Sequence, residues 1–174
     1  MRVPKIKRSK LTAFGRDDLK CENEFPSLDE LPHLPIDKEI RLRKIYYKNG
    51  FGTALKAIRL EFTYGLTSPL FEVQDSKYKL KSVELDPTRS IRKIAMNVCD
   101  SKGELRGLRL IDQFGKNIVE LIWSADSTDT KWIYKEVPKG QYIIGLYCNT
   151  RSSQSFIQSL GFILWSPSKR KISQ

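Results

Sequence analysis

The chain has 174 residues, 40% of them hydrophobic, which is enough for one substantial core, and no change in composition along it suggests a second folded domain. No apolar run approaches the roughly 18 residues of a membrane-spanning helix, and no apolar segment near Met1 resembles a secretory signal. The formal net charge of +11 favours acidic partners, such as nucleic acid, an anionic membrane surface or an acidic protein polymer.

Cysteine usage indicates the compartment. Cys21, Cys99 and Cys148 are odd in number and lack CxxC spacing, which favours a reducing compartment over a disulfide framework or a zinc site. We therefore expect a cytoplasmic protein, with Cys99 and Cys148 acting as small apolar residues in strands. The first sixteen residues are basic and free of acidic side chains, as in a mitochondrial presequence, so a mitochondrial location stays open.

Residues 1–38 form the first segment, which we expect to be an extended arm. A basic stretch is followed by an acidic stretch cut by Pro26, Pro32 and Pro35, and neither shows the periodicity of a core element. The segment is thus either a floppy tail or an arm laid across a partner. In the second case its apolar anchors are Phe25, Leu28, Leu31 and Leu34.

Residues 39–166 show a period of two, which is typical of half-buried strands. From Ile58 to Tyr64 apolar residues alternate with polar ones, and similar patterns occur around Met96, Arg109 and Phe162. No long helical pattern interrupts them. The sequence predicts one all-β domain over these residues, followed by a basic tail at 167–174.

Three hairpin patterns within this domain repeat at near-equal spacing. Leu55, Ile58 and Leu60 align with equivalent apolar positions about 50 residues later, and these align again with a third set. The second and third sets are Leu105, Leu108 and Leu110, then Ile157, Leu160 and Phe162. The repeat predicts a threefold β-prism of three Greek-key-like sheets, since no sheet can bury its inner face alone. The third hairpin has no later strands, so the N-terminal segment must complete its sheet.

The repeats, and especially "GQYIIGLYCNTRSSQSFIQSLGFIL", resemble the jacalin-like β-prism family. The resemblance implies a possible lectin, with a sugar site built from an N-terminal glycine region and a C-terminal GxxxD loop. Gln154 and Gln158 stand where that motif has its Gly and Asp, and a glutamine lacks the charge-assisted acceptor strength of a carboxylate. The carbohydrate-binding candidates are Asn149, Arg151, Ser153, Gln154 and Gln158.

No catalytic arrangement is visible in the sequence. The single histidine, His33, lies between Pro32 and Pro35 without an evident catalytic neighbour, and no nucleophile elbow, phosphate-binding loop or metal-ligand spacing occurs. We expect no enzyme activity, no cofactor and no metal.

Binding therefore remains the expected role. Our first hypothesis is a non-catalytic structural module that docks on an acidic partner within a larger assembly, most readily a microtubule or ciliary structure with tubulin as a partner. Nucleic acid is a weaker candidate, because no row of stacking aromatics accompanies the charges. The alternative is a lectin-like domain with an altered sugar site that binds a glycan. The partner-binding candidates are Lys5, Lys7, Arg8, Lys10, Arg16, Lys169, Arg170 and Lys171.

Overall fold

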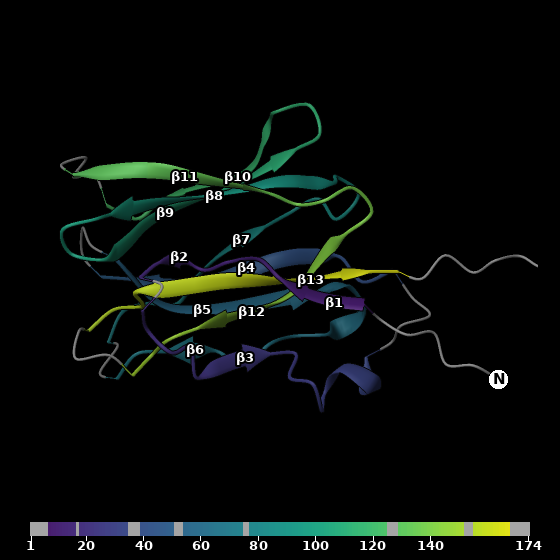
Figure 1. Ribbon diagram of the computed structural model, residues 1–174, viewed down its shortest axis with the longest axis horizontal. Helices are drawn as coiled ribbons and strands as arrows, with labels where there is room; N and C mark the ends of the chain where they lie inside the picture. The colour runs from purple at the N-terminus through teal and green to yellow at the C-terminus, as the bar shows by residue number, and fades with distance from the viewer. Residues whose placement is uncertain are drawn as a thin grey trace, which may run out of the picture.

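The computed structural model describes residues 7–16, 18–34, 39–50, 54–74, 77–124, 129–151 and 155–167 (Figure 1). Within these residues the regular structure is β, apart from two single 3-10 turns, η1 (Leu31–His33) and η2 (Thr63–Gly65). The strands form three antiparallel sheets, each built on a central hairpin. The predicted all-β, three-sheet prism is confirmed.

Two of the three sheets have the same plan. In each, a long central hairpin is flanked by one shorter strand on either side. One sheet has the order β6-β5-β4-β7 and consists of β4 (Leu42–Asn49), β5 (Leu55–Phe62), β6 (Phe71–Glu72) and β7 (Lys81–Glu84). The other has the order β10-β9-β8-β11 and consists of β8 (Ile91–Cys99), β9 (Glu104–Asp112), β10 (Asn117–Ile122) and β11 (Thr130–Glu136).

The remaining sheet joins the two ends of the chain. Its central hairpin is β12 (Tyr142–Cys148) and β13 (Ser159–Ser166), and the flanking strands come from the N-terminal segment, as the repeat requires. These strands are β1 (Lys7–Lys10), β2 (Phe14–Gly15) and β3 (Asn23–Phe25). Both β1 and β2 pair with β13, while β3 pairs with β12. Lys7 lies opposite Ser166, so the two ends of the described chain are adjacent.

The core lies between the three sheets. All nine aligned apolar positions of the repeats, from Leu55 to Phe162, are fully buried. Cys99 and Cys148 are also buried within β8 and β12, as predicted. The predicted turn at Asp100–Gly103 joins β8 to β9. The other two predicted turns, at 49–53 and 150–155, include residues outside the described part of the chain.

Two sequence-based expectations were wrong. Tyr64 was assigned to the apolar strand face of Ile58, but β5 ends at Phe62, and Tyr64 is 60% exposed with a positive φ of 63°. Phe25 and Leu34 of the N-terminal segment were expected to anchor an arm on a partner, yet both are buried with Phe14 in the prism core. Of the four proposed anchors, Leu31 packs against this core and Leu28 is 72% exposed.

In the described residues no helix is long and apolar enough to cross a membrane.

Candidate functional site

A polar cavity of about 540 Å³ lies at the end of the prism that carries the turns of the central hairpins. The β8–β9 turn forms one wall, the segment before β13 forms another, and Arg16 follows β2 at the side. The lining residues are Arg16, Asp100, Ser101, Lys102, Gly103, Glu104, Phe156 and Gln158. The cavity thus lies where the N-terminal segment meets two of the three central hairpins.

Gln158 is fixed in this cavity by its backbone. Asn149 Oδ1 accepts hydrogen bonds from the backbone N–H groups of Gln158 (3.1 Å) and Ser159 (2.8 Å). The Gln158 carbonyl in turn accepts a bond of 2.9 Å from the N–H of Arg16. Only 4% of Gln158 is exposed, so the residue is almost wholly buried in the wall of the cavity.

Two glycines allow this close packing. Gly15 has a φ of 86°, and a Cβ there would overlap the Gln158 carbonyl oxygen. Gly103 has a φ of 67°, and its Cβ would lie 3.2 Å from the Gln158 side-chain nitrogen. Positive φ is unfavourable for residues with a side chain, so both positions require glycine. The N-terminal segment therefore brings a glycine against the C-terminal loop, although the glycine-rich start of the jacalin-like family is absent.

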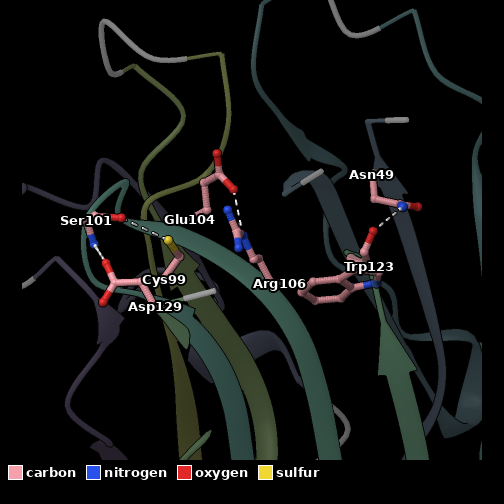
Figure 2. Close-up of polar contacts among 7 residues, drawn as sticks. All are labelled: Asn49, Cys99, Ser101, Glu104, Arg106, Trp123 and Asp129. Carbon is pink, nitrogen blue, oxygen red and sulfur yellow. Dashed lines mark hydrogen bonds and ion pairs between the residues drawn. The ribbon is translucent and has the colours of Figure 1, made fainter. Parts of the chain in front are cut away.

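Among the charged lining residues, Arg16, Asp100 and Glu104 form ion pairs. Arg106 Nε donates to Glu104 Oε2 at 2.8 Å, and Asp129 Oδ2 accepts the Ser101 N–H at 3.1 Å (Figure 2). Asp100 forms an ion pair with Lys131 at 3.1 Å, and Arg16 forms one with Asp18. Paired charges leave a cavity that is polar without a strong net charge, which suits a ligand rich in hydroxyl groups better than an isolated ion.

Lys56, Arg106 and Gln158 occupy equivalent positions in the three repeats, and all three are buried. Lys56 Nζ donates to the Ser155 carbonyl oxygen at 2.6 Å, so it ties β5 to the third hairpin loop. Burial lowers the pKa of Lys56, and the nearby carboxylate of Glu104 partly opposes that effect. Ile157 N–H also donates to the Leu55 carbonyl oxygen at 2.9 Å. These contacts hold the wall of the cavity against the neighbouring sheet.

The carbohydrate-binding candidates divide among different environments. Gln158 lines the cavity, whereas Asn149 is buried behind it and its amide oxygen is occupied by two N–H groups. Arg151 is exposed, and its N–H donates to Glu22 Oε1 at 2.9 Å. Ser153 and Gln154 lie outside the described residues. Asn149 thus positions Gln158 rather than facing the cavity.

The basic partner-binding candidates are not brought together as one set. Arg8 and Lys10 both form ion pairs with Glu24, with Arg8 Nη2 at 2.9 Å from Glu24 Oε2. Arg16 lies at the other end of the prism, in the cavity wall. Lys7 is described only through its place in β1, and Lys5, Lys169, Arg170 and Lys171 lie outside the described residues.

Sequence reasoning missed most of the cavity. Asp100, Ser101, Glu104 and Phe156 were not chosen, although the repeat alignment puts the second and third hairpin turns at the same end of the prism. That alignment was the available signal. In the described residues no group of three or more His, Cys, Asp or Glu side chains is arranged to hold a metal ion.

The architecture is that of a jacalin-like β-prism. Among solved structures, the chain resembles Malaysian banana lectin, with 18% identity, a TM-score of 0.57, and 91% of this chain and 98% of the lectin covered. It likewise resembles AcmJRL, a mannose-binding jacalin-related lectin from Ananas comosus, with 16% identity, a TM-score of 0.57, and 92% and 98% covered.

A third similar structure is the prostate-specific WGA16 glycoprotein lectin, with 19% identity, a TM-score of 0.57, and 75% of this chain and 86% of the lectin covered. No protein-family model matches the sequence, and no curated protein sequence matches it. At these identities the likeness establishes the fold, and fold alone does not determine the ligand.

Proposed function

We propose that this chain is a non-catalytic, lectin-like module that binds a neutral saccharide in the cavity around Gln158. The observation that carries the proposal is the place of Gln158, which aligns with the sugar-binding acid of jacalin-like lectins and lies in a polar cavity beside Gly15 and Gly103. A neutral amide both donates and accepts hydrogen bonds, as sugar hydroxyls do. Phe156 adds an aromatic surface to the lining.

The direct test is a glycan array followed by calorimetry. AcmJRL is described as mannose-binding, so methyl α-mannoside is the first probe. Replacing Gln158 by Ala removes a neutral hydrogen-bonding group, and we expect affinity to fall about three- to tenfold. Gln141→Ala is the matched control, because Gln141 immediately precedes β12, at the end of the strand away from this cavity, and accepts a bond from the Ser9 hydroxyl. No glycan binding, or equal effects of the two substitutions, would refute the proposal.

Docking on an acidic protein surface is the second candidate. The net charge of +11 favours it, and the basic residues at both ends of the sequence adjoin, along the chain, the paired strands β1 and β13. No feature of the described residues favours a microtubule, tubulin or a ciliary structure over another acidic surface. The two candidates involve opposite ends of the prism, so they can be tested separately.

A further inference from the structure

A second cavity, of about 420 Å³, lies at the end of the prism opposite the Gln158 cavity. All three sheets contribute to it, through the first residues of β4, β8 and β12 together with η2 and the turn before β8. Its charged and aromatic lining residues are Glu39, Arg41, Tyr64, Arg89 and Tyr142. We call it the tail-end cavity, because Tyr142 pairs with Trp165, next to the last residue of β13.

Arg41 is held in place on one side of this cavity. Its guanidinium carbon lies 3.6 Å from the centroid of the Tyr142 ring, and its Nη1 donates to the Ile40 carbonyl oxygen at 3.0 Å. The nearest carboxylate, that of Glu39, is 3.6 Å away on a side chain that is 82% exposed. Such an exposed pair is weak, so the charge of Arg41 is only loosely compensated.

Arg89 is held from another sheet. Its Nη2 donates to Asp112 Oδ2 at 2.6 Å, while Asp112 Oδ1 accepts the N–H groups of Phe114 and Lys116 at 2.9 Å each. Arginine has five N–H donors in a rigid plane, so the bond to Asp112 fixes the guanidinium and leaves donors for a ligand. The cavity thus contains two positioned guanidinium groups from different sheets.

Tyr64 places an aromatic ring in the lining of the cavity. Its backbone lies in the left-handed region, with φ 63° and ψ 25°, which is rare for a bulky residue, and Gly65 follows with φ 73°. Despite this unfavourable backbone, the side chain remains 60% exposed. The conformation belongs to the tight turn in which the Phe62 N–H donates to the Leu66 carbonyl oxygen at 2.7 Å, and this turn places the ring in the cavity lining.

From these features we propose that the tail-end cavity binds an acidic saccharide. Arg41 and Arg89 would take its sulfate or carboxylate group, since guanidinium groups match planar or tetrahedral oxyanions through paired hydrogen bonds. The sugar ring would pack against Tyr64. The volume of about 420 Å³ lies in the range of small-molecule sites. This site is separate from the one around Gln158, because the two cavities share no lining residue.

The test compares four ligands by calorimetry on the full chain: 6-sulfated N-acetyllactosamine, the same sugar without sulfate, glucuronic acid and inorganic sulfate. We expect the sulfated sugar to bind at least tenfold more tightly than its neutral counterpart, because charge-assisted bonds are the strong ones. Measurable binding of glucuronic acid would identify a carboxylate as a second accepted group. Inorganic sulfate binding as tightly as the sulfated sugar would overturn the saccharide assignment in favour of a simple anion site.

Arg41→Gln should weaken the sulfated sugar about tenfold or more. Arg43→Gln is the matched control, because Arg43 lies two residues further on in β4, loses the same charge and pairs with Glu61 outside the cavity. Equal losses in the two variants would show that binding is non-specific attraction to a basic protein, which overturns the proposal. Gln158→Ala should leave this binding unchanged, so failure here is separable from failure of the Gln158 site.

Tyr64→Gly tests the proposed contact between the sugar ring and Tyr64 without removing a buried side chain. Glycine adopts φ 63° freely, so the variant should melt at or above the wild-type temperature. We expect it to bind the sulfated sugar several-fold more weakly while its affinity for inorganic sulfate stays the same. Unchanged affinity for the sulfated sugar would exclude Tyr64 from the site and contradict the proposed sugar contact.

Discussion

At the residue scale, a single glycine determines how β12 and β13 pack. A Cβ at Gly161 would collide with the ring of Tyr147, which lies across β13 and donates its hydroxyl to the Leu11 carbonyl oxygen. Lys10 Nζ lies 4.9 Å from the centroid of the same ring. The glycine therefore lets Tyr147 connect the central hairpin to the N-terminal segment.

We predict that Gly161→Ala lowers the free energy of unfolding by about 1 to 3 kcal/mol, as overpacking does. Tyr147 must leave its place, and the contacts with Leu11 and Lys10 are lost with it. Urea denaturation followed by tryptophan fluorescence measures the change. Ser82→Ala, on exposed strand β7, serves as the control and should change stability by less than about 0.5 kcal/mol. A stable Gly161→Ala variant would mean that Tyr147 does not pack there.

Asp112 gives a residue-scale prediction about pH. The hydrogen bond from Arg89 and those from the backbone of Lys116 and Phe114 outweigh desolvation and hold the pKa of Asp112 below its usual value. The folded state therefore binds this proton less readily than the unfolded state. The stabilisation is complete above the ordinary Asp pKa of about 4 and is lost as pH falls through the lower folded value.

Asp112→Asn should accordingly be less stable than the wild type at neutral pH, and the difference should shrink as pH falls below about 4. Melting temperatures of both proteins across that range measure it. A difference that stays constant down to about pH 2 would contradict the assignment of an ionised, hydrogen-bonded carboxylate.

At the element scale, the N-terminal segment is part of the prism. Its strands β1 and β2 pair with β13, and Phe14 on β2 is buried in the core. Phe14→Ala should therefore cost about 3 to 5 kcal/mol, through lost burial and the cavity left behind. Leu28→Ala removes an apolar side chain from the same segment at a position that is 72% exposed, so it should be nearly neutral. Denaturant unfolding compares the two, and similar small losses would place Phe14 outside the core.

The long strands were predictable, but the short ones were not. Alternation over eight or nine residues identifies β5, β8, β9 and β13, whereas β2 has two residues and β3 has three, too few to show a period. Their positions are determined by pairing with a hairpin more than 120 residues away. Tyr64 was misplaced because an apolar residue continued the alternation beyond the turn that ends β5.

Of the residues that line the candidate site, the sequence singled out Gln158 as a carbohydrate-binding candidate and Arg16 as a candidate for binding an acidic partner. Motif alignment located Gln158, but the roles of Asn149 and Glu104 depend on hydrogen bonds and ion pairs that no periodic pattern encodes. The cavity assembles residues from three distant parts of the sequence, around Arg16, Gly103 and Gln158. The tail-end cavity had no sequence signal, since Arg41 and Arg89 resemble ordinary surface charges until the fold brings Tyr142 beneath one and Asp112 beside the other.

At the scale of the whole molecule, both basic ends of the sequence continue from neighbouring strand ends, Lys7 on β1 and Ser166 on β13. These two strands are paired, so the described chain begins and ends at the same end of the prism (Figure 1). Arg8 and Lys10 are poor choices for a charge-removal test, because both pair with Glu24 and their loss would also affect the fold. Lys5, Lys169, Arg170 and Lys171 lie beyond these strands, so they are the better choice.

We predict that changing Lys5, Lys169, Arg170 and Lys171 together to Gln weakens binding to an acidic polymer such as polyglutamate, and makes the remaining binding less dependent on salt. Exposed charges are screened over about 8 Å at physiological ionic strength, so removing a cluster should matter more than removing scattered charges. Changing Lys77, Lys79, Lys93 and Lys116 to Gln provides a control with the same net charge on exposed positions of the prism. Elution from immobilised polyglutamate at rising salt compares the variants. Equal shifts would show that net charge alone governs binding, which would exclude a docking surface at the chain ends and leave saccharide binding as the function to pursue.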